Sequence, residues 1–126
     1  MKAKLISVFG YKGDAMNLPV ADVASSVPFY VEKLGFSVSD ETQTLVKKAV
    51  LTRDGIQFAI AENGGDPEQH GCAFHTDAAE LLRDEFIANG LENIGELGEE
   101  TRGGSTFKVF FVVAPDGLCY WFGQRQ

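Results

Sequence analysis

The sequence has few cysteines and little positive charge. Only two cysteines, Cys72 and Cys119, occur in 126 residues, and they form no Cys-x-x-Cys pair. Two thiols are too few for a zinc cage or a disulfide framework, so we interpret both as buried free thiols. Lysine and arginine number 11 against 18 acidic residues, which gives a net charge of -7. That charge repels a phosphate backbone, so we expect no nucleic-acid partner.

Long apolar runs are also missing from the sequence. No stretch approaches the roughly 18 apolar residues that a membrane span requires. The segment from Met1 to Leu5 is not followed by the apolar core of a signal peptide. We therefore expect a cytoplasmic protein with no membrane partner. Apolar residues still make up 44% of the chain, which is sufficient for the core of a single globular domain.

Two segments share one pattern, in which an Asp-Gly turn precedes a strand with apolar residues at alternate positions. They run from Asp54 to Ile60 and from Asp116 to Phe122. A supersecondary unit that occurs twice predicts two similar halves, and the space between such halves is a natural ligand site.

Helix signals repeat at a constant interval. Asp22 and Asp77 are N-cap candidates, and Gly35 and Gly90 are candidates for the glycine that follows a helix. The members of each pair are 55 residues apart. The first apolar stripe is formed by Val23, Val27, Val31 and Leu34, with Tyr30 at its margin. Within it, Pro28 predicts either a kinked helix or one that begins nearer Ser25 or Ser26.

The chain is therefore predicted to be an α+β protein with two strand, helix, strand, strand, strand units. Module 1 covers about 13–63 and module 2 about 69–124. Residues 4–9 are predicted to add an edge strand, and the glycine-rich segment 98–104 is predicted to be a connection. The predicted strands cover 15–20, 36–39, 44–51, 56–61, 72–76, 92–97, 107–113 and 118–122.

Three motifs carry a family resemblance: Asn17 to Asp22, Pro28 to Phe36 and Ala114 to Gly117. With them the chain resembles the vicinal oxygen chelate superfamily. This superfamily includes glyoxalase I, extradiol dioxygenases, fosfomycin-resistance enzymes and bleomycin-resistance binding proteins, and the chain is closest in character to the last. The resemblance implies paired βαβββ modules whose curved mixed sheets enclose a cavity, commonly in a homodimer.

Enzymes of that superfamily hold a divalent metal with His, Gln or Glu side chains from the first and last strands of each module. The matching positions here are Ala15, Ala59, Gly71 and Trp121. None of these side chains is a metal ligand, and a shifted alignment offers at most two other donors. We therefore predict no metal and no other cofactor, and we assign no catalytic residue.

Strand parity predicts which side chains line the cavity instead. We predict that Asn17, Gln57, Ala59, His75 and Trp121 bind the ligand, with Trp121 as a stacking surface for a planar or cationic group. Small residues of the same parity are Ala15, Pro19, Ala61, Gly71, Ala73 and Cys119. The opposite parity, predicted to pack under the helices, comprises Ile56, Phe58, Ile60, Cys72, Phe74, Leu118, Tyr120 and Phe122.

These patterns lead to the hypothesis of a metal-independent protein that sequesters a small aromatic or cationic ligand, as a homodimer. Two alternatives stay open. One is a lyase or dioxygenase with an atypical metal site or with acid-base chemistry around His75 and Gln57. The other is a purely structural dimerisation module. Residues 99–102 are interpreted as solvated loop residues, with contact between Arg102 and a ligand as the alternative.

Overall fold

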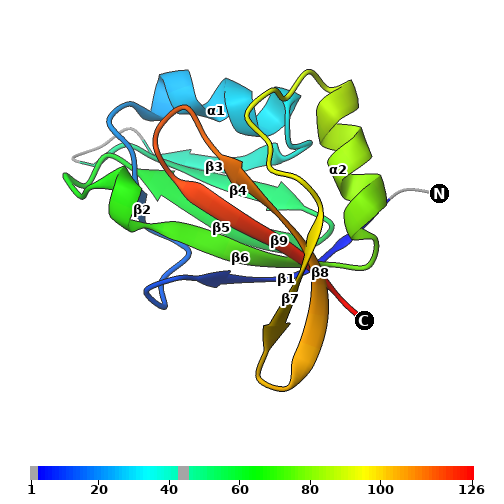
Figure 1. The fold of residues 1–126 in the computed structure, drawn as a ribbon. Helices are drawn as coiled ribbons and strands as arrows, with labels where there is room; N and C mark the ends of the chain where they lie inside the picture. The colour runs from blue at the N-terminus through cyan, green and yellow to red at the C-terminus, as the bar shows by residue number, and fades with distance from the viewer. Residues whose placement is uncertain (1–2, 43–45) are drawn as a thin grey trace.

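The computed structural model describes residues 3–42 and 46–126, which form two mixed sheets and two α-helices (Figure 1). Sheet A contains, in spatial order, β1 (Leu5–Gly10), β6 (Gly71–Thr76), β9 (Cys119–Arg125), β8 (Ser105–Val113) and β7 (Gly98–Arg102). Sheet B contains β2 (Leu18–Pro19), β5 (Ile56–Ala61), β4 (Lys48–Arg53) and β3 (Ser37–Thr42). The pairs β6/β9 and β2/β5 are parallel and the other pairs antiparallel. The predicted α+β class is confirmed.

Helix α1 (Val23–Glu32) begins where the sequence predicts. The Asp22 carboxylate accepts a hydrogen bond from the Ala24 amide at 3.1 Å, so Asp22 is the N-cap. The helix contains Pro28, and the alternative of a later start is wrong. The predicted stripe needs one correction, because Val31 is 41% exposed whereas Tyr30 is fully buried. The buried positions instead follow the helical period as Val23, Ser26, Tyr30 and Leu34.

Helix α2 (Ala79–Ala88) is not capped by Asp77, contrary to the prediction. The Asp77 carboxylate instead accepts from the Lys4 amide at 2.7 Å, next to the start of β1. The Ala79 amide donates instead to Oε1 of Gln124 on β9, at 2.9 Å. A side chain from another strand thus replaces the local cap, which a local sequence pattern cannot reveal. Neither helix, nor any other in the described residues, is long and apolar enough for a membrane span.

Strand β7 lies in the segment that was predicted to be a connection. It forms a hairpin with β8 through Gly103 and Gly104, whose φ angles are +54° and +81°. Two residues with positive φ make the turn that suits a two-residue hairpin. The strand expected at 92–97 is wrong, because within it only the Ile94 bridge to Val112 forms in the structure. The β7–β8 hairpin projects from the body of the molecule (Figure 1).

The other strands agree with the predictions to differing degrees. The edge strand expected at 4–9 is confirmed as β1, and the run 56–61 is confirmed as β5. The strand expected at 15–20 is reduced to β2, Leu18–Pro19. The strand expected at 44–51 appears as β4, Lys48–Arg53, and its first two predicted residues lie outside the described ones.

One hydrophobic core joins both helices and both sheets. It contains seven of the eight side chains whose parity predicted packing under the helices, and Ile56 lies partly buried against it. The central rings meet edge to face: Phe58 and Phe74 have centroids 5.5 Å apart, and Phe58 and Tyr120 have centroids 5.8 Å apart. This arrangement suits the quadrupoles of aromatic rings. The predicted core face is therefore confirmed.

A short network of hydrogen-bonded side chains lies within this core. The Tyr30 hydroxyl donates to Oδ2 of Asp116 at 2.7 Å and lies 2.7 Å from the Tyr120 hydroxyl, which is left to act as donor. The other carboxylate oxygen accepts from the Leu118 amide at 3.0 Å. Burial raises the pKa of both tyrosines well above the ordinary range. These partners satisfy groups that would otherwise destabilise the core.

Replacement of Asp116 by Asn is expected to change how stability depends on pH. Burial raises the pKa of the Asp116 carboxyl, so the folded state favours the protonated acid. Its stabilising contribution is present below the unfolded pKa of about 4 and is lost as pH rises through the higher folded pKa. Because asparagine does not titrate, the variant should gain stability relative to wild type as pH rises. Urea unfolding at acidic and neutral pH measures the difference, and a pH-independent difference would contradict this role.

Candidate functional site

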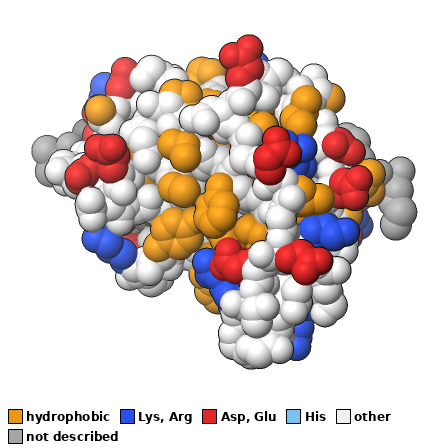
Figure 2. Space-filling model, in the orientation of Figure 1, with side chains coloured by type: hydrophobic (Ala, Val, Ile, Leu, Met, Phe, Trp, Pro, Cys, Tyr) orange, Lys and Arg blue, Asp and Glu red, His pale blue; other side chains and the backbone are white. Residues whose placement is uncertain are grey.

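An apolar row crosses the face of sheet A that points away from the core. Its members, Phe9, Ala73, Trp121 and Phe111, are direct partners on the adjacent strands β1, β6, β9 and β8. The residues beside them along each strand point into the core, so the row occupies the opposite face. Phe9 is 61% and Phe111 42% exposed, whereas the two central residues are buried. Figure 2 shows one face of the molecule, on which hydrophobic side chains gather near the centre, beside the projecting hairpin.

Trp121 lies at the centre of this row and has an enclosed ring. Its centroid is 5.1 Å from that of His75 and 5.5 Å from that of Phe107, both in edge contact. The indole lies along β9 over Gly123, where an added Cβ would come within 2.2 Å of the ring. Burial and the nearby Arg102 lower the pKa of His75, so its imidazole is neutral at pH 7.

Arg102, which the sequence analysis placed in a solvated loop, covers the indole. It is the last residue of β7, and its guanidinium carbon lies 4.7 Å from the centroid of the Trp121 ring. Its Nε donates to Glu100, two residues earlier on the same strand. The double glycine at 103–104, which makes the turn into β8, is the signal that could have identified this hairpin.

Tyr11 is a second residue of this face that the sequence analysis missed. Its amide donates to the Gly71 carbonyl at 3.0 Å, and its side chain is 45% exposed. The ring lies over Gly71, where an added Cβ would be 2.6 Å from a ring carbon. Burial and the neighbouring Cys119 raise the pKa of the Tyr11 hydroxyl above its usual range. The phenol is therefore an uncharged hydrogen-bonding group near the apolar row.

The other three predicted binding residues belong to or adjoin sheet B. Asn17 donates to Asp14 at 2.9 Å and accepts from Lys48 at 3.2 Å. Gln57 is exposed on β5, whereas Ala59 is fully buried and its amide donates to the Ala15 carbonyl at 2.9 Å. The structure thus brings His75 and Trp121 together and leaves the other three on a different sheet. Whether these residues bind a ligand stays a prediction.

The four positions that match metal ligands in the related enzymes do not fit a metal. Alanine, glycine and the indole of Trp121 offer no suitable lone pair, and the Gly71 site is closed by Tyr11 and the Cys119 carbonyl. Within residues 3–42 and 46–126, no three His, Cys, Asp or Glu side chains are grouped closely enough to hold a metal ion. We therefore derive no chemistry through a metal.

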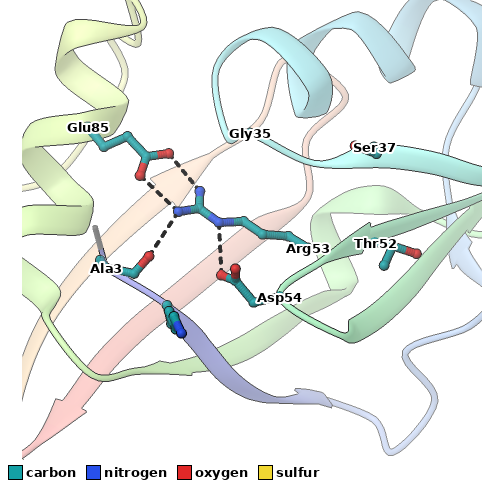
Figure 3. A pocket seen from close by; sticks show the side chains of 8 residues that line it. Ala3, Gly35, Ser37, Thr52, Arg53, Asp54 and Glu85 are labelled. Atoms are coloured by element: carbon teal, nitrogen blue, oxygen red, sulfur yellow. Dashed lines mark hydrogen bonds and ion pairs between the residues drawn. The ribbon is translucent and has the colours of Figure 1, made fainter. Parts of the chain in front are cut away.

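Three described pockets lie away from the apolar row. The largest of the three, about 550 Å³, is lined by Arg53 of β4, Glu85 of α2 and the residues just before β1 (Figure 3). Another of about 410 Å³ lies beside the first turn of α1 and Asp116, and one of about 390 Å³ lies near Gly90 and Leu91. The face around Trp121 is not one of these three pockets.

Known structures share this architecture. The bleomycin-binding protein from bleomycin-producing Streptomyces verticillus, solved with copper(II)-bleomycin, is 20% identical; the match has a TM-score of 0.69 and covers 88% of this chain and 93% of that one. The bleomycin resistance determinant encoded on transposon Tn5 is 24% identical, with a TM-score of 0.66 and coverage of 88% and 95%. A glyoxalase I mutant from Zea mays is 17% identical, with a TM-score of 0.58 and coverage of 86% and 44%. At these identities the likeness shows the fold.

The sequence itself identifies the family. No curated protein matches the chain. Residues 13–119, however, match the family described as the Glyoxalase/Bleomycin resistance protein/Dioxygenase superfamily, and this span covers most of the 126 residues. The chain therefore belongs to the glyoxalase/bleomycin resistance protein/dioxygenase superfamily.

Proposed function

We propose that this protein binds a small molecule on the face of sheet A around Trp121, without a metal and without catalysis. The observation that carries the proposal is the aromatic cluster of Trp121, His75 and Phe107 on a sheet face whose outer residues, Phe9 and Phe111, are exposed. Rigid aromatic surfaces with a few polar groups are typical of small-molecule sites. Two proteins of the same fold are bleomycin-binding or bleomycin resistance proteins by name, which supports a binding role. The cytoplasm stays our prediction for its location.

We further propose that the binding form is a homodimer in which a second copy covers the apolar row. Phe9 and Phe111 are large, apolar and exposed at the two ends of the row, an arrangement that favours burial against another surface. The predicted binding residues are divided between two sheets, with Gln57 exposed on the other one. A partner that presents its sheet B to Trp121 would bring the predicted binding residues of the two sheets together. The acidic net charge opposes self-association, so apolar contacts must dominate.

The dimer is tested by Phe111→Asp, with Leu81→Asp as the matched control. Both residues are exposed to a similar extent, 42% and 45%, but Leu81 lies on α2 and not on the apolar row. A charge buried at an interface without a partner weakens association strongly. We expect Phe111→Asp to raise the dimer dissociation constant at least about tenfold, the equivalent of about 1.4 kcal/mol, in sedimentation velocity. Equal effects of the two variants, or none for Phe111→Asp, would contradict this interface.

Ligand binding is tested by a thermal-shift screen of aromatic compounds. A compound at about 100 times its dissociation constant stabilises the folded state by about 2.7 kcal/mol, which raises the melting temperature by several degrees. Trp121→Ala should abolish the shift, whereas Leu81→Ala should keep it. If no aromatic compound raises the melting temperature, the proposal is wrong. Elemental analysis that finds one Ni, Zn, Mn or Fe per chain would instead favour a lyase or dioxygenase.

A further inference from the structure

The cation-binding face of Trp121 is already occupied within the chain. The Arg102 guanidinium lies 4.7 Å from the indole centroid, in the position that a cationic ligand would take. A ligand cation would have to displace this side chain and would then meet a like charge nearby. The cationic ligand suggested by the sequence alone therefore does not suit this face. A ligand of opposite charge would be attracted to it.

Trp121 also holds an unused hydrogen-bond donor. Its Nε1 is buried and has no hydrogen-bond partner among the described residues, and the residue as a whole is only 1% exposed. Buried donors without a partner are rare in folded proteins. The donor belongs to the same ring that Arg102 covers, which brings an N–H and a positive charge to one part of this face. A carboxylate is the common group that offers two acceptor oxygens to such a pair.

Glu100 shows how a carboxylate is accommodated here. Its side chain accepts from the Arg102 Nε, and both residues lie on the same face of the β7–β8 hairpin because they are two positions apart. About half of the Arg102 side chain remains exposed, and within the described residues Glu100 is its only hydrogen-bond partner. A ligand carboxylate could take the place of Glu100 on Arg102.

We propose that the face around Trp121 binds a planar aromatic carboxylate, whose acid group is held by the Trp121 Nε1 and Arg102. This inference rests on the proposed binding function and names its ligand class. The aromatic ring would lie against the apolar row, where Phe9 and Phe111 expose apolar surface. Glu100 is the competing carboxylate within the chain, and it gives way when the ligand binds.

The single tryptophan makes this proposal directly testable. The indole N–H of Trp121 gives one cross-peak in a ¹H–¹⁵N spectrum of the uniformly labelled protein. We would titrate the protein with benzoate and with benzamidine, which have the same ring and opposite charge. Benzoate should shift the indole peak in a saturable manner, and benzamidine should leave it unchanged. Acetate, which lacks the ring, should bind at least about tenfold more weakly than benzoate.

Two variants separate this ligand class from a structural role of the hairpin. Arg102→Gln should weaken benzoate binding at least about tenfold, because the cation is lost. Glu100→Gln should strengthen it several-fold, because the competing carboxylate is removed. If the hairpin had only a structural role, both substitutions would change the affinity for benzoate in the same direction. Equal effects of the two variants would overturn the assignment.

The remaining outcomes distinguish this inference from the proposed function. If benzamidine shifts the indole peak and benzoate does not, the aromatic carboxylate is wrong but a small-molecule site at Trp121 stands. If neither compound shifts the peak, the carboxylate assignment is wrong. The thermal-shift screen then decides separately whether the proposed binding function also fails.

Discussion

Replacement of Gly71 by alanine is expected to destabilise the protein by about 3 kcal/mol, at the upper end of the usual cost of overpacking. An added Cβ at this position would lie 1.8 Å from the Cys119 carbonyl oxygen on the adjacent parallel strand and 2.6 Å from a Tyr11 ring carbon. A side chain can rotate away from such an overlap, but the backbone carbonyl of a paired strand cannot. The strands β6 and β9 must then separate, or the chain must remain unfolded.

The matched control for this variant is Gly98→Ala at the start of β7. An added Cβ there meets nothing within 4 Å, and the residue does not require a positive φ. We expect this substitution to change the free energy of unfolding by less than about 1 kcal/mol. The variant is stabilised if alanine lowers the conformational entropy of the unfolded chain. Urea unfolding monitored by far-ultraviolet circular dichroism measures both variants. If Gly71→Ala is as stable as Gly98→Ala, the close approach of β6 and β9 does not exist.

The same overlap has a functional consequence. Position 71 matches a metal-ligand position of the related enzymes, and a histidine placed there would carry the same Cβ. Restoring one missing ligand by substitution should therefore damage the fold before it creates a metal site. The close approach at Gly71 thus adds a packing obstacle to the missing ligand chemistry in this chain.

Alternation along the central strands made most of the fold predictable. The period of two assigns every second side chain of β5, β6 and β9 to one face, so the buried set around Phe58, Phe74 and Tyr120 followed from the sequence. The repeated Asp-Gly turns then predicted two similar halves. These signals are local, and tertiary contacts reinforce rather than oppose them.

Strand β7 could not be found in the same way, because its residues are polar and exposed. An edge strand with a charged surface gives no apolar alternation, and its glycines resemble those of a loop. The position of Arg102 over Trp121 was missed for this reason. Its approach depends on the pairing of β7 with β8 at the edge of sheet A, which is a property of the assembled sheet.

The sequence predicted which face of its strand each candidate site residue occupies, but not which of these residues lie close together. Parity correctly grouped His75 with Trp121, whose rings are in contact. Parity says which face of a strand a residue occupies, but it does not say which two faces meet. Asn17 and Gln57 therefore appeared to share a cavity with Trp121, although they lie with the other sheet of the chain. Only the packing of the two modules determines that relation.

Replacement of Arg53 by methionine is expected to reduce the free energy of unfolding by about 3 kcal/mol, as removal of one partner from a buried ion pair does. The side chain, only 8% exposed, leaves the end of β4 and binds both carboxylate oxygens of Glu85 on α2 at 2.8 Å (Figure 3). Its nitrogens also donate to the carbonyls of Leu34 at 2.7 Å and Ala3 at 3.3 Å. One guanidinium thus ties together both modules and the N-terminal strand. Methionine fills the volume but leaves these acceptors without a donor.

Partial exposure of Glu85 sets the size of this loss. Its side chain is 26% exposed, so water can solvate the abandoned carboxylate, and we place the effect at the low end of the range for buried pairs. Arg83→Met is the matched control, because Arg83 lies on α2, the helix that carries Glu85. Its ion-pair partner Glu96 lies 3.8 Å away and has a side chain that is 97% exposed. That variant should lose no more than about 1 kcal/mol. Equal losses in the two variants, measured by urea unfolding, would mean that Arg53 does not couple the modules. A double-mutant cycle of Arg53→Met with Glu85→Leu isolates the pair itself. A coupling energy near zero would assign the loss to the other partners of Arg53, which are the two carbonyls and the Asp54 carboxylate.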